Sequence, residues 1–478
     1  MRHEDFLKNV ERLSCAVLGF GVSNRPLVRF LLELGAKTVT VHDKKSIEEL
    51  GEDAETLMGE GVRFVTGEEY LDVIDADVIF RSPGIRPDKG GIPAALARGA
   101  FLTSEMELFF AMTKARIIAV TGSDGKTTTT TLISKILAAE LEKNGDGRVY
   151  VGGNIGEPLL PRVKEMSEKD FAIVELSSFQ LMTMKQSPWR AVVTNLTPNH
   201  LDWHTDMDEY LAAKLNICSY PEISLLVTNA ENDVTARLAS EYVGRLTLFS
   251  SKASDGASFV GSIFERHAVY ERNGVICTFD GVTETPILKT EEIRLLGRHN
   301  VENYMAAIAV LDGLVSKQSV CEIARTFGGV EHRLEFVREL DGVRYINSSI
   351  DSSPTRTVAA LSALTEKPIV ICGGYDKHIP FEPLGIALCE RAKAVVLTGA
   401  TASKIADAIA GTGGDTPPVH LEADFKAAVY RARELADRGD IVLLSPACAS
   451  FDAFENFAVR GRFFKKIVRE MEEKHGTF

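Results

Sequence analysis

The chain has 478 residues, beyond the roughly 250–300 at which one hydrophobic core stops growing, so about three domains are expected. Hydrophobic residues make up 45 % and charged residues 25 %, which excludes a largely disordered, collagen-like or membrane-embedded chain. The net charge of −13 at pH 7 disfavours nonspecific binding to polyanions, so we expect no nucleic-acid partner. No window approaches 18 uninterrupted apolar residues, so we expect no membrane span.

The seven cysteines are scattered without a CxxC pair, and the N-terminal segment lacks the apolar run of a signal peptide. Free thiols in a reducing compartment fit this pattern better than a disulfide framework. A cytoplasmic location is therefore expected.

Short apolar runs alternate with helix-like stretches along the whole chain, which is typical of α/β domains with parallel sheets. Each run ends in small or polar residues. The predicted strands fall in three groups, 15–21, 38–43 and 77–84, then 116–122, 171–177, 190–197 and 224–230, and finally 367–374, 394–400 and 441–447.

Residues 245–290 differ, because short runs separated by Gly or Asn predict antiparallel hairpins that form an edge sheet on the middle domain. A helix is predicted from about Asn300, where apolar residues recur at helical spacing. Boundaries near 115 and 329 then divide the chain into domains 1–115, 116–328 and 329–478.

In the first domain, Gly19-x-Gly21 follows a predicted strand, and Asp43 ends the next strand, as in a dinucleotide-binding turn. Asn24 replaces the third glycine. Backbone N–H groups of such a turn can hold a diphosphate, and Asp43 can accept a hydrogen bond from a sugar hydroxyl. On this feature alone, a NAD-type oxidoreductase stays open as an alternative.

The strongest motif is VTGSDGKTTTTTL at 120–132, between an apolar strand and a helix-compatible run. Backbone N–H groups in such a turn cradle phosphate, Lys126 can reach the terminal phosphates, and Thr127 can bind Mg²⁺. The first glycine of the usual eight-residue pattern would fall at Val120, so a chance Gly-Lys-Thr in an ordinary turn is the alternative.

Neighbouring strands bring candidate metal ligands to the same sheet edge. Glu175 ends the apolar run FAIVE, the place of a Walker-B-like acid, and the next strand leads to His200. On the residues alone, Glu175 can also be a surface carboxylate and His200 a core or surface histidine. Lys214, on a predicted amphipathic helix, is by itself more typical of a solvated lysine.

The last domain places polar and cationic groups after its strands. Arg333 follows the domain boundary, Lys377 stands beyond a strand end, and SPACASFDAFENF (445–457) follows another strand with small residues and then aromatics. Because ligands of α/β domains bind at the carboxyl edge of the sheet, these segments predict a third ligand site.

The chain resembles the Mur ligase family in an ordered set of motifs that covers nearly its whole length: GFGVSN, SPGI, VTGSDGKTT, GGNIG, VELSSFQL, NLTPNHLDWH, YLAAKL, GRHNVENYMAA, EHRLE, GGYDK and LLSPACASFDAFENF. Within the family, VELSSFQL and SPACASFDAF are most similar to the members that add D-glutamate to UDP-N-acetylmuramoyl-L-alanine. The resemblance implies an α/β fold of three domains. These are a Rossmann-like N-terminal domain for the UDP substrate, a P-loop mononucleotide-binding central domain with extra antiparallel strands, and a Rossmann-like C-terminal domain for the amino acid.

The resemblance also implies an ATP-dependent carbon–nitrogen ligase of peptidoglycan precursor synthesis. ATP would phosphorylate the substrate carboxylate to an acyl phosphate, which the amine of D-glutamate then attacks. The implied cofactors are ATP and Mg²⁺. The implied partners are the small molecules UDP-N-acetylmuramoyl-L-alanine, D-glutamate and ATP, and a monomer is expected.

Roles for individual residues follow from the same resemblance. The residues expected to bind ATP are Gly122, Ser123, Asp124, Gly125, Lys126, Thr127, Thr128, Asn300, Asn303 and Arg333. Those expected to act in catalysis are Lys126, Glu175, His200 and Lys214, and those expected at the metal are Thr127, Glu175, His200 and Lys214, the last as a carbamate. The UDP substrate would contact Gly21, Val22, Ser23, Asp43, Gly84 and Asn154, and the amino acid Ser352, Lys377, Ser450 and Phe457.

One segment departs from the family pattern. Where many of these ligases have Asn-Asp-Ser-Lys-Ala-Thr-Asn, this chain reads Asn-Ser-Ser-Ile-Asp-Ser-Ser at 347–353. The acid and the lysine are missing at their places, although Ser352 keeps a hydroxyl where the pattern has threonine. The departure leaves open a related ligase with another amino acid or acceptor, and also a nucleotide-binding regulator without catalysis.

Overall fold

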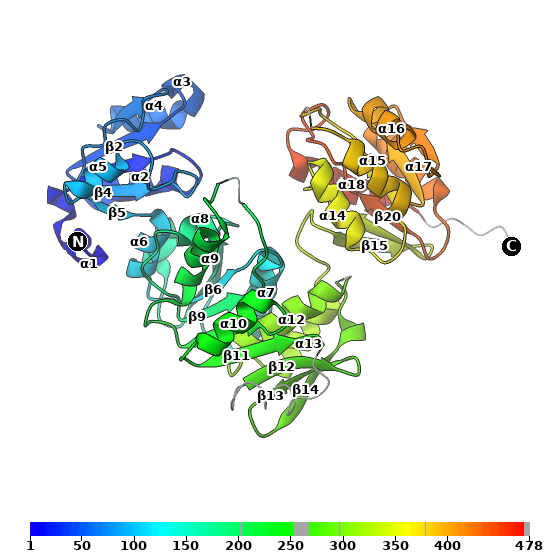
Figure 1. The fold of residues 1–478 in the computed structure, drawn as a ribbon, viewed down its shortest axis with the longest axis horizontal. Helices are drawn as coiled ribbons and strands as arrows, with labels where there is room; N and C mark the ends of the chain where they lie inside the picture. The colour runs from blue at the N-terminus through cyan, green and yellow to red at the C-terminus, as the bar shows by residue number, and fades with distance from the viewer. Residues whose placement is uncertain (201–202, 253–266, 296, 378, 473–478) are drawn as a thin grey trace. The chain divides into compact units, whose positions relative to one another are not determined.

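The computed structural model describes residues 1–200, 203–252, 267–295, 297–377 and 379–472. Its three β-sheets, each packed against helices, confirm the predicted three-domain α/β class (Figure 1). By contacts the chain divides into two units, Met1–Glu291 with Val301–Ile323, and Glu292–Asn300 with Ala324–Phe478. The domain boundaries near 115 and 329 stay predictions. Within the described part of the chain, no helix has the length and apolar character needed to cross a membrane.

The first sheet is entirely parallel, with strand order β3-β2-β1-β4-β5. Its strands are β1 (Ser14–Leu18), β2 (Thr38–Asp43), β3 (Arg63–Thr66), β4 (Val78–Arg81) and β5 (Phe101–Thr103). The accompanying helices are α1 (His3–Asn9), η1 (Val10–Arg12), α2 (Asn24–Glu33), α3 (Ile47–Leu50), α4 (Glu52–Gly59), α5 (Ile92–Ala97) and α6 (Glu105–Met112).

The middle sheet has nine strands in the order β14-β13-β12-β11-β10-β9-β6-β8-β7. Its strands are β6 (Arg116–Thr121), β7 (Val149–Gly153), β8 (Phe171–Glu175), β9 (Arg190–Val193), β10 (Leu225–Asn229), β11 (Leu246–Ser250), β12 (His267–Arg272), β13 (Val275–Phe279) and β14 (Glu284–Lys289). Its helices are α7 (Lys126–Asn144), η2 (Leu160–Glu165), α8 (Ser178–Leu181), α9 (Met207–Leu215), η3 (Asn216–Cys218), α10 (Asp233–Glu241), η4 (Thr290–Glu292), α12 (Arg298–Val310) and α13 (Lys317–Thr326).

One part of the prediction for 245–290 is wrong. Strand β11 pairs in parallel with both β10 and β12, so it extends the parallel sheet instead of forming a hairpin. Strands β12, β13 and β14 are antiparallel as predicted, but they continue the same nine-stranded sheet. Part of the predicted segment, 253–266, lies outside the described residues.

A single hydrophobic core joins the first two sheets. It includes Val17 and Phe80 from the first sheet and Ala119 and Val174 from the middle sheet, all of them buried. Because burial of apolar surface is the main favourable term in folding, this shared core explains why the first two domains form one contact unit.

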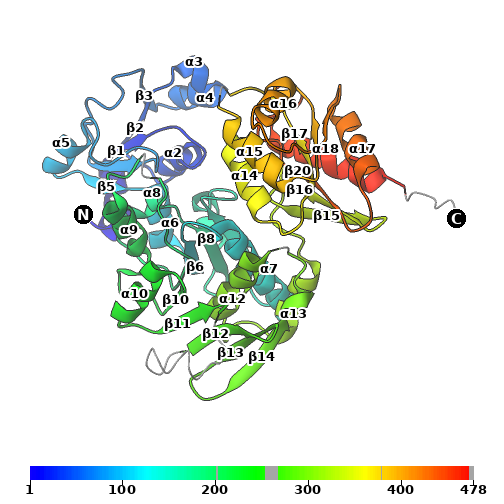
Figure 2. The same ribbon diagram turned by 45° about the vertical axis from the view of Figure 1, so that its right-hand side comes forward.

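The third sheet has the order β15-β16-β20-β17-β18-β19, antiparallel only between β15 and β16. Helices α14, α15 and α16 cover one face, while α17 and α18 cover the other (Figure 2). The strands are β15 (Glu335–Leu340), β16 (Val343–Asn347), β17 (Ile369–Cys372), β18 (Ala394–Leu397), β19 (Val419–Leu421) and β20 (Ile441–Leu444). The helices are α14 (Pro354–Ser362), α15 (Glu382–Arg391), α16 (Ala402–Ala410), α17 (Phe425–Leu435) and α18 (Phe457–Glu470).

Most sequence predictions of strands are confirmed, since each of the ten predicted parallel runs overlaps a strand. The predicted helix near Asn300 is α12. All seven cysteines are free, as expected.

Candidate active site

The phosphate-loop motif connects β6 to α7 in the predicted strand-to-helix arrangement. Gly122 has a φ of +146°, and a Cβ atom there would lie 1.9 Å from Oγ1 of Thr194. The Lys126 ammonium donates to the carbonyl oxygens of Gly122 (2.9 Å) and Ser123 (2.8 Å). The loop is thus a tight glycine turn at a helix N-terminus, the arrangement that presents N–H groups and a lysine to phosphate.

Side chains from the β9 loop and α9 support the phosphate loop. The Ser123 hydroxyl donates to the Thr197 carbonyl (2.9 Å) and lies 2.8 Å from the Tyr210 hydroxyl. The Asp124 N–H donates to Oδ1 of Asn195 (2.9 Å). Tyr210 is fully buried, and sequence reasoning missed it because its contact partner stands far away in the chain.

Asn303, predicted to bind ATP, lies beside the same loop. Its Oδ1 atom accepts from the Thr129 hydroxyl (3.2 Å), and a Cβ atom on Gly125 would lie 2.5 Å from it. Gly125 has a φ of +76° and caps α7, so both conformation and space require glycine there. Asn300, the other predicted contact on α12, is buried but belongs to the second contact unit.

Glu175 is a buried carboxylate, not a solvated surface group. It is 1 % exposed at the end of β8, where Oε2 accepts from the Thr127 hydroxyl (2.7 Å) and Oε1 from the Asn154 amide (2.7 Å). The structure therefore brings together Thr127, Glu175 and Asn154. Hydroxyl and carboxylate oxygens are hard ligands of the kind that Mg²⁺ prefers, so this donor set fits the predicted metal.

Lys214 is also buried, with 2 % of its surface exposed, so the solvated-lysine alternative is wrong. Its ammonium donates to the Gly122 carbonyl (2.8 Å) and the Thr121 hydroxyl (3.3 Å), at the base of the phosphate loop. Burial, reinforced by the charge of Lys126, lowers the pKa of Lys214 to about 7. The predicted catalytic lysine therefore lies at the phosphate loop.

His200 is exposed, with a φ of +56°, and its ring lies against that of Phe179, with 4.9 Å between centroids. The buried histidine of this loop is instead His204, whose Nε2 atom is 2.9 Å from the Ser178 hydroxyl and whose Nδ1 is 3.1 Å from Oε2 of Glu209. In the described part of the chain, no three His, Cys, Asp or Glu side chains converge in a metal-binding group. Of the predicted metal ligands, Glu175 and His200 belong to these residue types, whereas Thr127 and Lys214 do not.

An ion pair joins the first domain to α9. Arg86 donates through both terminal nitrogens to Glu209, at 2.9 and 3.0 Å, and also to the Trp203 carbonyl (2.7 Å). The bidentate bond holds the pKa of Glu209 down to about 2. Because Glu209 and Lys214 share α9, the turn after β4 is tied directly to the helix that carries Lys214.

Buried Arg81 strengthens this connection. Its guanidinium donates to the carbonyls of Pro83 (3.0 Å) and Ile85 (2.7 Å), and through the other nitrogen to that of Phe179 (2.7 Å). It therefore shapes the turn that contains Gly84 and links that turn to the segment after β8. Gly84 itself is exposed with open space around it.

The glycine turn after β1 has an accessible tip. Gly21 and Val22 are exposed and Ser23 is half-buried. Asn24 donates to the Gly19 carbonyl (2.8 Å), so the residue in place of a third glycine braces the turn. Asp43 accepts from the N–H of Phe20 (2.6 Å), which means that it also shapes this turn.

In the third domain, three segments meet at the carboxyl edge of the sheet. The N–H of Ser348 donates to the carbonyl oxygen of Leu444 (2.8 Å), and the N–H of Gly373 donates to the carbonyl oxygen of Pro446 (2.8 Å). Buried Arg460, on α18, donates to the carbonyls of Cys448 (3.0 Å) and Ala449 (3.1 Å), which fixes the SPACAS loop. Ser450 is buried in that loop, while Ser352 is half-buried and Lys377 and Phe457 are exposed.

The loop with Arg333 is anchored by its neighbours. Buried His332 accepts at Nδ1 from the Asn347 amide (3.0 Å), and Asn347 also donates to Glu335 (2.9 Å). The Lys465 ammonium donates a hydrogen bond to Oε1 of Glu335 (2.8 Å). Arg333 is exposed at this anchored loop, so its guanidinium is presented to solvent within its unit.

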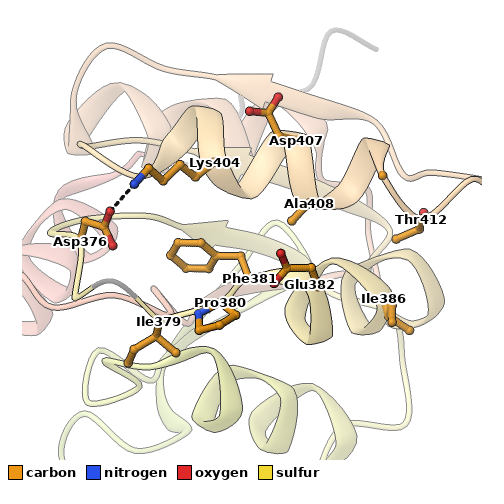
Figure 3. Close-up of a pocket in the computed structure, with 11 residues that line it drawn as sticks. Asp376, Ile379, Pro380, Phe381, Glu382, Ile386, Lys404, Asp407, Ala408 and Thr412 are labelled. Carbon is orange, nitrogen blue, oxygen red and sulfur yellow. Dashed lines mark hydrogen bonds and ion pairs between the residues drawn. The ribbon is translucent and has the colours of Figure 1, made fainter.

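A cavity of about 800 Å³ opens between α15 and α16 (Figure 3). Its lining combines Phe381 and Ile386 with the ion pair of Asp376 and Lys404 (2.5 Å). None of the four residues predicted to bind the amino acid is among the described residues that line it, so we do not assign the amino acid to this cavity.

The fold and the site define a class. An α/β chain of three sheets, with a phosphate loop backed by buried Glu175 and Lys214, has the arrangement of a nucleotide-binding enzyme. The sequence matches the Mur ligase middle domain over residues 120–311, the Mur ligase glutamate ligase domain over 332–448 and the MurD N-terminal domain over 14–90. The chain belongs to the Mur ligase family.

Among curated relatives, the chain is 47 % identical to the UDP-N-acetylmuramoylalanine--D-glutamate ligase of Clostridium novyi, covering 98 % of each chain. It is 45 % identical to the ligase of the same name from Clostridium acetobutylicum, covering 98 % of this chain and 99 % of that one. Among solved structures, the fold is similar to that of UDP-N-acetylmuramate-alanine ligase MurC from Thermotoga maritima, with a TM-score of 0.52, 18 % identity, and coverage of 96 % of this chain and 100 % of that one.

Proposed function

We propose that this chain is an ATP-dependent ligase that joins D-glutamate to UDP-N-acetylmuramoyl-L-alanine in peptidoglycan precursor synthesis. The observation that carries the proposal is the full-length similarity to ligases of that name, at 47 % identity. Half-buried Thr127, bonded to buried Glu175, and buried Lys214, bonded to the phosphate loop, support it, because these groups suit phosphoryl transfer. Membership of this family leaves the oxidoreductase alternative without support.

The reaction would proceed in two steps. A carboxylate oxygen of the UDP substrate attacks the γ-phosphorus of ATP, and ADP leaves, which yields an acyl phosphate. The D-glutamate amine then attacks the acyl carbon, loses a proton, and expels inorganic phosphate to form the amide. Activation is required because a carboxylate is a poor electrophile until one oxygen is part of a good leaving group.

Residues of the phosphate loop would act on the transferring group. The N–H groups of 122–128 and the Lys126 ammonium would bind the phosphates and stabilise the charge that develops. Thr127 and Glu175 would hold Mg²⁺, with His200 and carbamylated Lys214 as the further predicted ligands. Magnesium, when bound, supplies charge neutralisation between the phosphates.

Each of the three domains would supply most of the contacts to one substrate. The turns with Gly21, Val22, Ser23, Asp43 and Gly84, together with Asn154, would contact the UDP substrate. ATP would contact Asn300, Asn303 and Arg333 besides the loop residues. The amino acid would contact Ser352, Lys377, Ser450 and Phe457. We propose domain boundaries near 115 and 329, a cytoplasmic location and a monomeric state.

The test is ligation by the purified full-length chain with ATP, Mg²⁺ and UDP-N-acetylmuramoyl-L-alanine. Phosphate release that requires D-glutamate, together with a product mass equal to both substrates minus water, is expected. Lys126→Ala should abolish both signals, whereas Lys135→Ala, on the exposed side of the same helix, should retain them. No phosphate release from the wild type on adding D-glutamate would contradict the proposal.

The altered segment 347–353 favours one second candidate, a ligase of the same chemistry with a different amino acid. A panel of D- and L-amino acids in the same assay, read by product mass, decides between them. A chain that ligates none of them would instead support the regulator without catalysis.

A further inference from the structure

Segment 347–353 contains a carboxylate, but not where the family pattern has it. The pattern Asn-Asp-Ser-Lys-Ala-Thr-Asn has its acid at the second place and alanine at the fifth. This chain has Ser348 at the second place and Asp351 at the fifth. Compared with the pattern, the segment therefore retains an acid, at position 351 instead of position 348.

The turn after β16 brings these two positions together. The N–H of Asp351 donates to the Ser348 carbonyl (3.0 Å), which closes a tight turn. The Ser348 side chain also lowers the pKa of the Asp351 carboxyl, in opposition to burial, which raises it. Asp351 thus lies in the same tight turn as the position where the pattern has its acid, so the two positions are neighbours in space.

The carboxylate is buried and accepts a hydrogen bond from a hydroxyl group. Asp351 is 6 % exposed, and its Oδ2 atom accepts from the Ser445 hydroxyl at 2.8 Å. That hydroxyl also lies 2.8 Å from the hydroxyl of Thr357 on α14. Asp351 therefore connects the turn to the strand end of β20 and to the start of α14.

Two predicted ligand contacts adjoin this carboxylate. Ser352, expected at the amino acid, is the next residue and is half-buried. The positive charge of Arg333, expected at ATP, acts on Asp351, as does that of Arg356. An anion at this place can therefore orient the Ser352 turn and hold the Arg333 guanidinium nearby.

We propose that Asp351 is a positioning residue that performs, from position 351, the task of the acid that the family pattern has at 348. It fixes the turn that presents Ser352 and draws Arg333 toward the sheet edge. The inference rests on the proposed function, because the task is measured through ligation.

A cost in stability is consistent with this role. Burial raises the pKa of Asp351 to about 6, so ionising it at neutral pH disfavours the folded state. Alanine, the residue of the pattern at this place, would avoid that cost. Residues that lower the stability of the folded state and are nevertheless retained are typical of functional sites.

The experiment returns the acid from position 351 to position 348. Asp351→Ala and Asp351→Asn should each lower kcat/KM for the amino acid by about tenfold to a hundredfold. The double variant Ser348→Asp with Asp351→Ala should regain activity to within about threefold of the wild type, because it restores one acid at the same place. Thr355→Ala, at an exposed position of α14, is the control and should match the wild type.

Urea unfolding at pH 7.5 provides the second readout. Asp351→Asn should be at least as stable as the wild type while losing activity. An Asp351→Ala variant with wild-type kinetics, a folded double variant as inactive as Asp351→Ala, or a loss of stability in Asp351→Asn that parallels its loss of activity would each overturn the inference.

The two proposals fail separately. A wild type that ligates only another amino acid contradicts the proposed substrate, and the same four variants are then compared with that amino acid. A wild type that ligates none overturns both.

Discussion

Gly122 is a residue at which backbone conformation and space both exclude a side chain. Its φ of +146° is rarely adopted by L-residues, and a Cβ atom would collide with Thr194. We expect Gly122→Ala to reduce ATP turnover by at least about a hundredfold and to cost roughly 1–3 kcal/mol in the free energy of unfolding. Steady-state kinetics and urea unfolding measure the two effects.

Gly59→Ala is the matched control, because Gly59 ends α4 with open space around it and no positive φ. It should leave turnover unchanged and alter stability by less than about 1 kcal/mol. Equal losses in both variants would show that the phosphate loop tolerates a side chain at Gly122.

Glu105 provides a prediction on pH at the same scale. The side chain is buried on α6 near the Leu160 N–H, and burial raises its pKa to about 7. A raised carboxyl pKa in the folded state contributes stability that is present below pH 4.5 and is lost as the pH rises through 7.

Glu105→Gln removes this titration. Relative to the wild type, the variant should gain about 2–3 kcal/mol in the free energy of unfolding between pH 4.5 and pH 8. Urea unfolding across that range measures the difference, with Glu142→Gln at an exposed position of α7 as the control. A constant difference between Glu105→Gln and the wild type would contradict the raised pKa.

At the scale of elements, α9 joins two proposed ligand sites. It carries Glu209, which is bonded to Arg86 in the turn after β4, and Lys214, which is bonded to the phosphate loop. A bidentate, partly buried ion pair of this kind should fix the position of the helix. The turn proposed to contact the UDP substrate and the lysine proposed to act in catalysis are therefore connected through one helix.

A double-mutant cycle of Arg86→Ala and Glu209→Ala tests this coupling. We expect an interaction energy of about 1–3 kcal/mol in urea unfolding, since the side chains are 13 % and 23 % exposed. The pair Arg162 and Glu165, at 45 % and 52 % exposure, is the control and should give less than about 1 kcal/mol. Equal energies for the two pairs would argue against a fixed connection.

At the scale of the whole molecule, the net charge of −13 disfavours the approach of all three substrates, because each of them is an anion. We therefore propose that their binding depends on local groups such as Lys126, Arg333 and the backbone N–H groups of the phosphate loop. Such local sites predict that each substrate protects its own part of the chain from hydrogen exchange.

Hydrogen exchange read by mass spectrometry tests this assignment. ATP with Mg²⁺ should protect 120–132, the UDP substrate 18–24 and 81–86, and D-glutamate 347–353 and 445–457. At about 100 times its Kd, one ligand stabilises the folded state by roughly 2.7 kcal/mol. Protection of 445–457 by ATP alone, with none at 120–132, would contradict the assignment.

The sequence alone determined the features that rest on neighbouring residues. Buried parallel strands are continuous apolar runs, so each of the ten predicted runs overlaps a strand. The phosphate loop was equally clear, because strand, glycine turn and helix follow one another in the chain. Edge strands such as β3, with three of four residues exposed, lack that signal and were missed.

Tertiary structure decided what depends on residues far apart in sequence. The direction of β11 follows from its neighbours β10 and β12, which no local pattern contains. Burial separated Glu175 and Lys214 from ordinary surface charges, since exposure depends on what packs above a side chain. The contact between Asp351 and Ser445 joins segments 94 residues apart. Only the folded chain shows that the displaced acid lies in one tight turn with position 348.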